Sequence, residues 1–398
     1  MEWKEVRLGD VCTRVCSGGT PKSTNLSYYG GKIPWLNTKE IDFNRIYSTE
    51  KTITDSGLNN SSAKWIAPNT VTVAMYGATA GKSCIVKVPM TTNQACCNLT
   101  INDEVADYEF VYYTLKNDYT TLASLANGGA QQNLNAQIIK DYVLKMPSLA
   151  DQRRIASILS SLDRKIELNN KINADLEEMA QAIFKNWFVD FEPFKDSKFV
   201  DSELGMIPEG WKVGTLGDIT KNKSAKVKER NDVKVLSPVT TGELVLSDEY
   251  FTKQVFSSSI AKYKIVNKGD FAYNPARVNI GSLGRNDFDF DGCVSPVYVV
   301  FSVLDGYENY FDLFRKTDFF KDSVASLAIG GVRQSLSYDD LSSIEVIIPS
   351  ENAVEEFNNL YNQMKKTIKA NKLESSRLSL LRDTLLPRLM SGELEVPE

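Results

Sequence analysis

The segment YGATAGKSCIV, at residues 76–86, holds the residue types of a phosphate-binding loop, with Gly77 followed by Gly-Lys-Ser at 81–83. Such a loop cradles phosphates with successive backbone N–H groups and needs four residues between its two glycines. Here only three intervene, and the residues that follow read as a short strand ended by Pro89. A phosphate loop should instead lead into a helix. The segment is therefore not expected to bind ATP.

The other residues that could perform chemistry form no catalytic set. Histidine is absent, which removes Ser-His-Asp and Cys-His catalysis and the commonest metal ligand. The run Asn-Pro-Ala-Arg at 274–277 is similar to the Asn-Pro-Pro-aromatic motif of amino-methyltransferases, but arginine replaces the ring that stacks on a flipped base. No Gly-x-Gly loop, Pro-Asp dipeptide or Cys-x-x-Cys pair occurs. We expect no catalytic site, metal or cofactor on this chain.

Composition limits the class of protein. A chain of 398 residues with 42% hydrophobic content should form two to three packed domains. No apolar run is long enough to span a membrane, and the charged start MEWKEVRLGD does not resemble a signal peptide. The six cysteines read as reduced, buried thiols, so a cytoplasmic location is expected. Because the net charge is −5, nucleic acid could bind only at local basic surfaces.

The sequence contains an internal repeat. ASLANGGAQQNLN at 123–135 returns as ASLAIGGVRQSLS at 325–337, with eight of thirteen positions identical. WKEVRLGDV at 3–11 returns, in the same order along the chain, as WKVGTLGDI at 211–219. Chance similarity is hard to reconcile with several blocks in one order, so the pattern indicates an internal duplication.

Each copy pairs a mixed domain with a long helix. Short β-branched and aromatic runs broken by Gly, Pro and Asn read as strands. A stretch with helical apolar spacing follows at 150–190 and again at 350–386. The polar linker at 190–211 contains two prolines and two glycines and marks the boundary between the copies.

The two helices carry a repeating apolar series. Seven-residue steps join Ile155, Leu162, Leu176 and Ile183 in the first helix and Phe357, Met364, Leu378 and Leu385 in the second, and Ile158, Ile172 and Met179 fill companion positions. The series is interrupted once in each helix, by Asn169 and Asn371. A coiled-coil seam with one buried Asn in each helix would fix the helix–helix register. An ordinary amphipathic helix with a solvated Asn is the alternative.

The two ends of the sequence suggest that the two copies close on each other. The terminal GELEVPE at 392–398 is similar to SELGMIPE at 202–209, so the chain stops where another copy would begin. We expect a pseudo-two-fold arrangement in which the two helices pack antiparallel, Asn169 meets Asn371, and the termini lie close together. Two reading domains on a rod of about 55 Å would suit DNA, whose groove face recurs about every 34 Å.

In its repeated blocks and in several further segments, the chain resembles the specificity (S) subunit of type I restriction–modification systems. The segments that carry the resemblance in the first copy lie at 17–41, 77–86, 128–135 and 146–166, the last reading MPSLADQRRIASILSSLDRKI. Those in the second copy lie at 202–213, 274–284, 330–337 and 385–394. Their order, given twice, is specific, although no single motif is diagnostic.

The resemblance implies an α+β fold with two mixed α/β target recognition domains separated by two long antiparallel coiled-coil helices. The expected domains are a first recognition domain at 1–149, a spacer helix at 150–190, a linker with the second recognition domain at 191–349, and a second spacer helix with a tail at 350–398. It implies binding to double-stranded DNA at a bipartite site. Because the two domains differ strongly outside the repeated blocks, we expect that site to be asymmetric. It further implies two methyltransferase (M) subunits and restriction (R) subunits as partners, which would carry S-adenosylmethionine, ATP and Mg.

The residues that could contact DNA are basic or amide side chains near small residues. The densest basic run, KNKSAKVKER at 221–230, is either a phosphate-binding arm or a solvated loop, and the Gly-Gly-x-[QR]-Q blocks are either base-reading or structural loops. The segment 77–86 is read as a turn before a core strand, in which Lys82 contacts a phosphate or serves the turn alone. The candidates are Lys22, Asn37, Lys39, Lys82, Gln131 and Gln132 in the first copy and Lys221, Lys223, Lys226, Lys228, Arg277, Asn279, Arg285, Arg333 and Gln334 in the second.

A subunit interface is expected on the first helix. The apolar run of Ile183, Phe184, Trp187 and Phe188 is too wide for one seam. It could contact an M subunit or be buried against the chain's own recognition domain. Two other functions are open from the sequence: a stand-alone DNA methyltransferase or nuclease with similar recognition domains, and a coiled-coil adaptor that binds no DNA.

Overall fold

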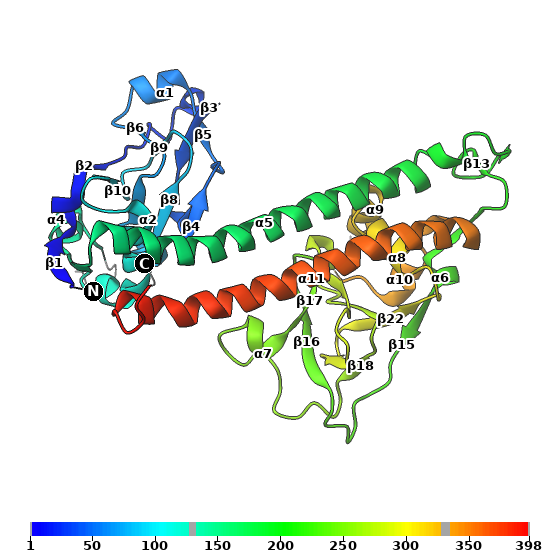
Figure 1. Cartoon of the computed structure of the whole chain (residues 1–398). Coiled ribbons are helices and arrows are strands. Elements are labelled where there is room, and N and C mark those ends of the chain that lie inside the picture. Colours follow the sequence, from blue (N-terminus) through cyan, green and yellow to red (C-terminus); the bar gives the residue numbers. More distant parts are fainter. Residues whose placement is uncertain (1, 127–132, 328–334, 397–398) are drawn as a thin grey trace. The chain divides into compact units, whose positions relative to one another are not determined.

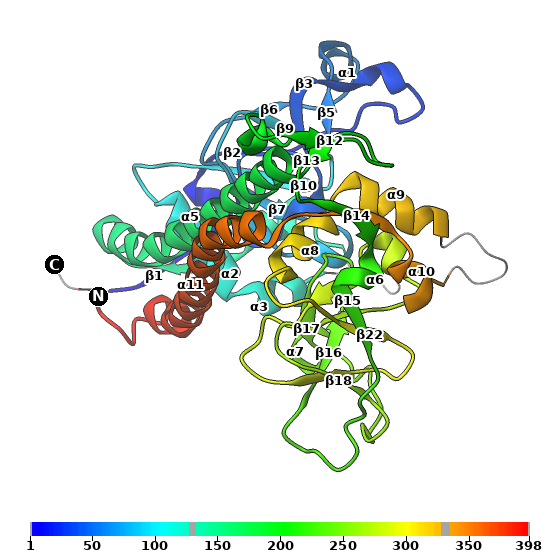
Figure 2. The ribbon, with the colours of Figure 1, turned by 90° about the vertical axis from the view of Figure 1, so that its right-hand side faces the viewer.

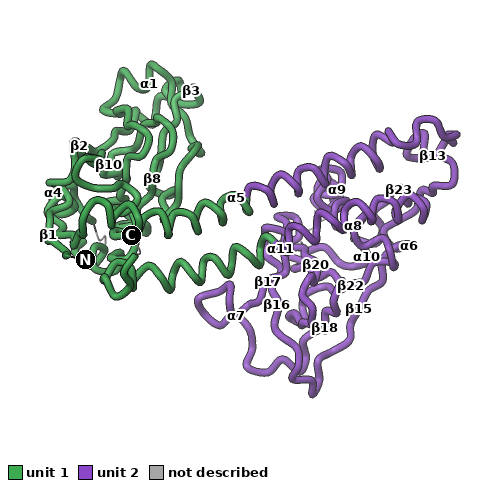
Figure 3. The backbone as a smooth tube through the Cα atoms, viewed as in Figure 1, with its two compact units in different colours: residues 1–170, 371–398 green, residues 171–370 purple. Residues whose placement is uncertain are grey.

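The computed structural model describes residues 2–126, 133–327 and 335–396, which form two compact units (Figures 1 and 3). Unit 1 contains residues 1–170 and 371–398, and unit 2 contains residues 171–370. Two long helices, α5 (Leu149–Phe188) and α11 (Glu351–Met390), contribute one half to each unit. These helices coincide closely with the stretches that the apolar spacing predicts.

Unit 1 is built on two main sheets. A five-stranded sheet has the order β2-β10-β7-β8-β4, a four-stranded sheet has the order β5-β3-β9-β6, and β1 pairs with β11. The strands are β1 (Lys4–Arg7), β2 (Cys12–Ser17), β3 (Tyr29–Leu36), β4 (Asn44–Ile46), β5 (Thr52–Ile53), β6 (Trp65–Ile66), β7 (Val71–Ala74), β8 (Ser83–Val86), β9 (Met90–Thr92), β10 (Cys96–Ile101) and β11 (Val143–Met146). The short helices are α1 (Asp55–Asn59), α2 (Tyr108–Asn117), α3 (Tyr119–Ser124) and α4 (Ala136–Asp141).

Unit 2 repeats this plan. Its sheets have the orders β15-β22-β19-β20 and β17-β16-β21-β18, and β14 pairs with β23. The strands are β12 (Phe199–Val200), β13 (Ile207–Pro208), β14 (Lys212–Thr215), β15 (Thr220–Lys223), β16 (Lys234–Pro238), β17 (Leu244–Leu246), β18 (Lys264–Val266), β19 (Phe271–Tyr273), β20 (Leu283–Arg285), β21 (Gly292–Val294), β22 (Val299–Val303) and β23 (Glu345–Ile348). The helices are α6 (Leu216–Ile219), α7 (Ser247–Tyr250), α8 (Glu308–Phe314), α9 (Asp318–Leu327) and α10 (Tyr338–Ser342).

The duplication seen in the sequence is therefore also a duplication of topology. In unit 1, β3 pairs parallel with β9 and β6 joins β9 antiparallel; in unit 2, β16 pairs parallel with β21 and β18 joins β21 antiparallel. The antiparallel pair β7·β8 corresponds to β19·β20 in the same way. The α+β fold class predicted from the sequence is confirmed.

Local sequence explains where the long helices begin. The repeated Pro-Ser dipeptide, at 147–148 and 349–350, precedes each of them. The hydroxyl of Ser148 accepts a hydrogen bond from the N–H of Asp151, 3.2 Å away, and that of Ser350 accepts one from Ala353, 3.4 Å away. Each Ser thus satisfies one of the N–H groups that a helix start leaves without a partner.

In each unit a short helix lies between the sheet and the long helices. In unit 2, α8 separates α11 from β15 and β22 in both views of the ribbon (Figures 1 and 2). Phe311 of α8 packs edge-on against Phe271 of β19, at 4.9 Å between ring centroids. In unit 1, α2 holds the same place: its Phe110 is buried in the core together with Val71 and Val73 of β7. Buried apolar area at these contacts supplies most of the stabilisation of each unit.

The helix–helix seam differs from its prediction. In unit 1 the contacts of Asp163 with Arg382 and of Asn169 with Glu374 show that α5 and α11 run antiparallel. Two expected companion residues, Ile158 and Met179, are 36% and 51% exposed. Asn169 is buried as expected, and the polar side chains of Gln152, Ser160 and Asp163 on the same helix are buried as well. The seam is thus more polar than a heptad series implies, because recognition domains cover part of each helix and change which face is buried.

The two ends of the chain meet in unit 1. Gly392, just beyond α11, lies so close to Trp3 that a Cβ there would come within 2.7 Å of the indole nitrogen. Val396 is buried in the same core as Leu386 and Met390. In unit 2, Trp211 takes the corresponding place and packs against Phe188 and Phe194 beyond the end of α5. The expected proximity of the termini is observed.

Candidate nucleic-acid interface

In each unit two turns meet, one of them the turn that joins β7 to β8 in unit 1 and β19 to β20 in unit 2. In unit 1, the hydroxyl of Thr79 donates a hydrogen bond to the carbonyl oxygen of Thr38, at 3.0 Å. In unit 2, Gly281 lies so close to Thr240 that a Cβ there would come within 2.7 Å of the carbonyl oxygen. We call these segments the paired turns: 37–42 with 76–82 in unit 1, and 239–242 with 274–282 in unit 2.

The segment that follows each Gly-Gly block is anchored to these turns. Leu134 donates its N–H to the carbonyl of Met75, and Leu336 donates its N–H to the carbonyl of Pro275, at 2.9 and 3.1 Å. Tyr76 and Asn133 form an isolated β-bridge beside the first of these bonds. The candidates Gln131, Gln132, Arg333 and Gln334 themselves lie outside the described residues.

The paired turns gather some of the predicted DNA contacts. Lys39 is exposed on its turn in unit 1, and Arg277 and Asn279 are exposed on theirs in unit 2. Lys22 is exposed on a neighbouring loop, where Gly19 accepts a hydrogen bond from the Trp35 indole. The basic run of unit 2 is separate: Lys221, Lys226 and Lys228 are exposed on β15 and the loop after it.

Four of the candidates make contacts that hold the fold together. Lys82 forms an ion pair with Asp42, with 2.6 Å between Nζ and Oδ1, and Lys223 forms one with the buried Asp270 at 2.7 Å. Asn37 accepts a hydrogen bond from Asn93, and Arg285 donates one to Asn309. Each of these four side chains has a protein partner in the described structure, and its contact with DNA stays a prediction. Sequence spacing gives no signal for such partners.

Arg45 is a residue that sequence reasoning missed. Its side chain is 3% exposed, and its guanidinium contacts Glu109, Tyr113 and Glu167 at 3.3, 3.2 and 3.0 Å. Asp163 lies 3.7 Å from the same group, and it also receives hydrogen bonds from Tyr113 and from Arg382 of α11. This network, the Arg45 cluster, ties the sheet of unit 1 to α2 and to both long helices. A buried arginine with no sequence neighbour in the network could not be found from spacing.

Unit 2 has a different network at the corresponding place, which we call the Asp312 cluster. Asp312 of α8 is buried and binds Arg315 at 2.6 Å, with Lys365 of α11 at 3.9 Å. Burial opposes ionisation of this carboxyl, but Arg315 and Lys365 outweigh it and hold its pKa well below the usual value. Lys365 also binds Asp287, and the amide of Asn309 donates to Asn358 and Asn362 of α11.

Asn169 occupies the seam between the long helices in unit 1. It is fully buried, and its amide nitrogen donates to the Glu374 carboxylate at 2.8 Å and to the Ser375 hydroxyl at 3.4 Å. Its amide oxygen is buried without a hydrogen-bond partner among the described residues. The amide and Lys165 lower the pKa of Glu374. The partner of Asn169 is thus one turn beyond Asn371, the residue expected from the sequence.

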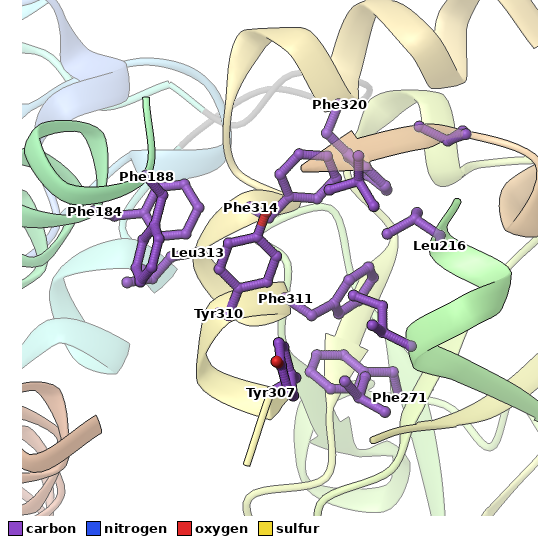
Figure 4. Close-up of a cluster of buried hydrophobic side chains, with 14 of the residues drawn as sticks. Phe184, Phe188, Leu216, Phe271, Tyr307, Tyr310, Phe311, Leu313, Phe314 and Phe320 are labelled. Atoms are coloured by element: carbon purple, nitrogen blue, oxygen red, sulfur yellow. The ribbon is translucent and has the colours of Figure 1, made fainter. Parts of the chain in front are cut away.

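The apolar run on α5 is not an exposed interface. Phe184 and Phe188 are 2% and 4% exposed and belong to the core of unit 2, with Ile183 and Trp187 packed against it. Figure 4 shows Phe184 and Phe188 close to Tyr310 and Leu313 of α8. The rings of Phe188 and Tyr310 meet edge-on at 5.1 Å. These residues are therefore buried against the chain's own recognition domain, as the alternative interpretation proposed, and they do not form an exposed surface for an M subunit.

Exposed leucines lie elsewhere on the helices. On α11 in unit 1, Leu373, Leu380 and Leu381 are 52%, 70% and 47% exposed. Their spacing of seven and eight residues places them on one side of the helix. The heptad pattern did not find them because they fall between its positions.

The described residues hold no arrangement suited to catalysis by a thiol or a metal. All six cysteines are free, and burial raises the pKa of Cys293 to about 11 and that of Cys97 to about 12. Reactive thiols have depressed pKa values instead. Over residues 2–126, 133–327 and 335–396, acidic and Cys side chains form no group of three or more able to hold a metal. In the same ranges, no helix has the length and hydropathy needed to cross a membrane.

Comparison with known proteins identifies a family. A family model described as type I restriction modification DNA specificity domain matches residues 1–178. The chain is 31% identical, over its full length and 94% of the relative, to the type I restriction enzyme MjaIX specificity subunit of Methanocaldococcus jannaschii. It is 23% identical, over 99% of this chain and the whole relative, to the HindI specificity subunit of Haemophilus influenzae. The fold matches a crystal structure of a type I restriction–modification S subunit from M. genitalium, with a TM-score of 0.63, 17% identity, and 98% and 96% of the two chains covered.

Proposed function

This chain belongs to the family of DNA specificity subunits of type I restriction–modification systems, and we propose that each of its units reads one half of a bipartite DNA site. As a specificity subunit, it recognises DNA sequence and leaves the chemistry to other subunits. The paired turns, together with the Gly-Gly segments anchored to them, are the proposed reading surfaces. The DNA partner implies a cytoplasmic location.

The observation that carries this proposal is that the paired turns occur twice with different side chains. Unit 1 presents Lys39 from its turns, whereas unit 2 presents Arg277 and Asn279. Arginine suits guanine and an amide suits adenine, while lysine suits a phosphate. Because the two surfaces differ, the two half-sites should differ, and the complete site should be asymmetric. Gln131, Gln132, Arg333 and Gln334 remain candidates from the sequence.

The long helices are the proposed scaffold for the other subunits. Leu373, Leu380 and Leu381 form an apolar strip on α11 that an M subunit could cover, and apolar strips of this kind mark protein contacts. We propose two M subunits, with R subunits added for restriction. S-adenosylmethionine, ATP and Mg would be bound by those partners.

The first test is methylation mapping of DNA from cells that express this chain with its neighbouring M subunit. We expect a bipartite, asymmetric methyladenine motif that disappears when the chain is deleted. The double variant Arg277→Ala, Asn279→Ala should relax only one half of the motif, and Lys39→Ala should leave the sequence of both halves unchanged. A palindromic motif, or relaxation of both halves by the double variant, would overturn the assignment of one unit to one half-site.

The scaffold proposal has its own test. Leu380→Glu with Leu381→Glu should weaken assembly with the M subunit by at least tenfold while the chain stays folded, because both side chains are exposed. Val105→Glu, at a residue outside α11 that is as exposed as Leu381, is the matched control. Unchanged assembly, measured by analytical ultracentrifugation, would place the M-subunit contact elsewhere.

The two alternative functions make different predictions. A stand-alone methyltransferase or nuclease would methylate or cleave DNA without a second subunit. A coiled-coil adaptor would show no DNA motif at all. Assaying the purified chain alone and with its M subunit separates all three functions.

A further inference from the structure

An aromatic ring directly follows the first of the paired turns in unit 1, and the corresponding place in unit 2 has none. Phe43 stands directly before β4 in a left-handed backbone conformation, with φ of 50°. Its ring meets that of Tyr119 edge-on, at 5.3 Å between centroids, and the ammonium of Lys116 lies 5.8 Å from its centre. The ring is thus held between a cation and a second ring, an arrangement that favours any flat aromatic group.

Unit 2 has a glycine at the corresponding corner. Gly242 stands just before β17, also in a left-handed conformation, with φ of 82°. A Cβ at Gly284 in β20 would come within 2.5 Å of the backbone of Glu243 and Leu244, so the start of β17 lies beside β20 much as β4 lies beside β8. A Cβ at Gly242 would lie 3.0 Å from the guanidinium of Arg315. A side chain here would therefore point to the end of α8, as Phe43 points to the end of α2.

The missing ring leaves a cavity of about 410 Å³. Its apolar wall is formed by Val278, Phe320 and Val324, and its basic wall by Arg315, Lys316 and Lys321. Lys316 lies just beyond the end of α8, and Lys116 lies in the last turn of α2. Each lysine is followed in the sequence by an Asp and then by an aromatic residue. The cavity wall thus contains a cation, Lys316, and a ring, Phe320, just as a cation and a ring hold Phe43 in unit 1.

The charges of the wall favour an anion on the occupant. Arg315 is fixed by Asp312 and by the carbonyl of Leu283, at 2.6 and 2.8 Å, so it forms a rigid part of the wall. Lys321 is exposed and pairs with Asp318 at 3.2 Å, which an incoming phosphate could replace. The cavity volume lies within the range of small-ligand sites and exceeds what one aromatic ring needs.

We propose that this cavity of unit 2 binds a nucleobase with its attached phosphate, the base taking the place that Phe43 fills in unit 1. The proposal rests on the DNA-binding function for its biological setting, although the binding itself does not require that function. The base could come from a free nucleotide or from an unstacked base of bound DNA, since both present the same ring and phosphate.

Binding is tested on the full chain with 2-aminopurine 5′-monophosphate, whose fluorescence reports stacking on a ring. We expect one site per chain in the wild type. Gly242→Phe should abolish it by supplying the ring, and Lys316→Glu should weaken it at least tenfold, which is the scale of losing a stacked, cation-bound base. Lys253→Glu, at an exposed lysine of unit 2 outside the cavity wall, should change nothing.

The reciprocal variant tests the comparison directly. Phe43→Gly should create a second nucleotide site in unit 1, beside Lys116 and Tyr119.

Because Gly242→Phe could fail to fold, its folding is checked by circular dichroism. The Lys316→Glu variant tests nucleotide binding in the cavity independently of Gly242→Phe. If the Lys316→Glu variant binds 2-aminopurine 5′-monophosphate as tightly as the wild type does, the proposal is overturned.

The two sources of the base are separated on DNA carrying the mapped motif, with 2-aminopurine placed at each position in turn. A position that becomes fluorescent in the wild-type complex but not with Gly242→Phe identifies a DNA base. Nucleotide binding without such a position identifies a free nucleotide. Neither signal, in a complex that binds its motif normally, overturns the inference and leaves the proposed function intact. Failure to bind DNA at all counts against the function instead.

Discussion

The two units fasten their recognition domains to the long helices with opposite charges. In unit 1 the helix α5 presents Asp163 and Glu167 to the buried guanidinium of Arg45. The residues 202 positions later, Lys365 and Lys369 on α11, instead face the carboxylates of unit 2. The duplication preserved the topology and the position of the polar contact between sheet domain and helix. The charges on the two sides of that contact are exchanged between the units. Each recognition domain is therefore matched electrostatically to its own half of the helices.

The largest expected effect comes from breaking the Arg45 cluster. Arg45→Met leaves Glu109, Asp163 and Glu167 close together with one cation fewer, and removing one partner from a buried ionic network costs about 3–5 kcal/mol. Urea unfolding should show this loss. Arg230→Met, which removes the surface ion pairs with Asp232 and Asp291, should cost clearly less than Arg45→Met. Equal losses would show that burial of the network is not what matters.

A second test addresses the same place in unit 2. Asp312→Asn keeps the shape but removes the charge that Arg315 and Lys365 share, which should cost about 2 kcal/mol. Because the folded pKa of Asp312 is depressed, its stabilisation is complete above the unfolded value of about 3.9 and is lost as the pH falls through the folded value.

Unfolding curves at several pH values should therefore show a shallower loss of stability below about pH 4 for the variant than for the wild type. Parallel curves would mean that Asp312 is not the group that titrates.

Reversing the charges on the helix sharpens the comparison. Lys365→Asp with Lys369→Glu gives α11 the charges of α5 and sets carboxylates against Asp287, Asp289 and Asp312. Since both lysines are partly exposed, we expect a loss of about 1–2 kcal/mol, smaller than that for Arg45→Met.

A chimera tests whether this matching limits exchange of recognition domains. Unit 1's recognition domain, placed on the helices of unit 2, should fold better with the double variant than with wild-type α11. Equal folding of both chimeras would show that the charges do not set compatibility.

The smallest effect concerns DNA rather than stability. Lys82 is already paired with Asp42, whereas Lys39 is exposed on the turn that meets it. Lys39→Ala should reduce the slope of log K against log salt by about 0.9, the change for one phosphate contact, and Lys82→Ala by clearly less. Equal reductions would mean that Lys82 leaves Asp42 for a phosphate when DNA binds.

By itself, the sequence determined the duplication, the two long helices and the absence of a phosphate-binding loop. These follow from local patterns: repeated blocks in one order, seven-residue apolar steps, and a missing residue between two glycines. The Pro-Ser dipeptides that precede α5 and α11 are also local, since a helix start depends on its nearest neighbours.

Tertiary structure alone decided which side chains are available. Phe184 and Phe188 form an apolar run in the sequence, but α8 covers them in the structure, and Arg285 is hydrogen-bonded to Asn309. Arg45, Asp163 and Arg382 are far apart in the chain and form one cluster only when β4, α5 and α11 pack together. Burial and pairing depend on what lies opposite a residue in space, and one chain's local pattern does not contain that information.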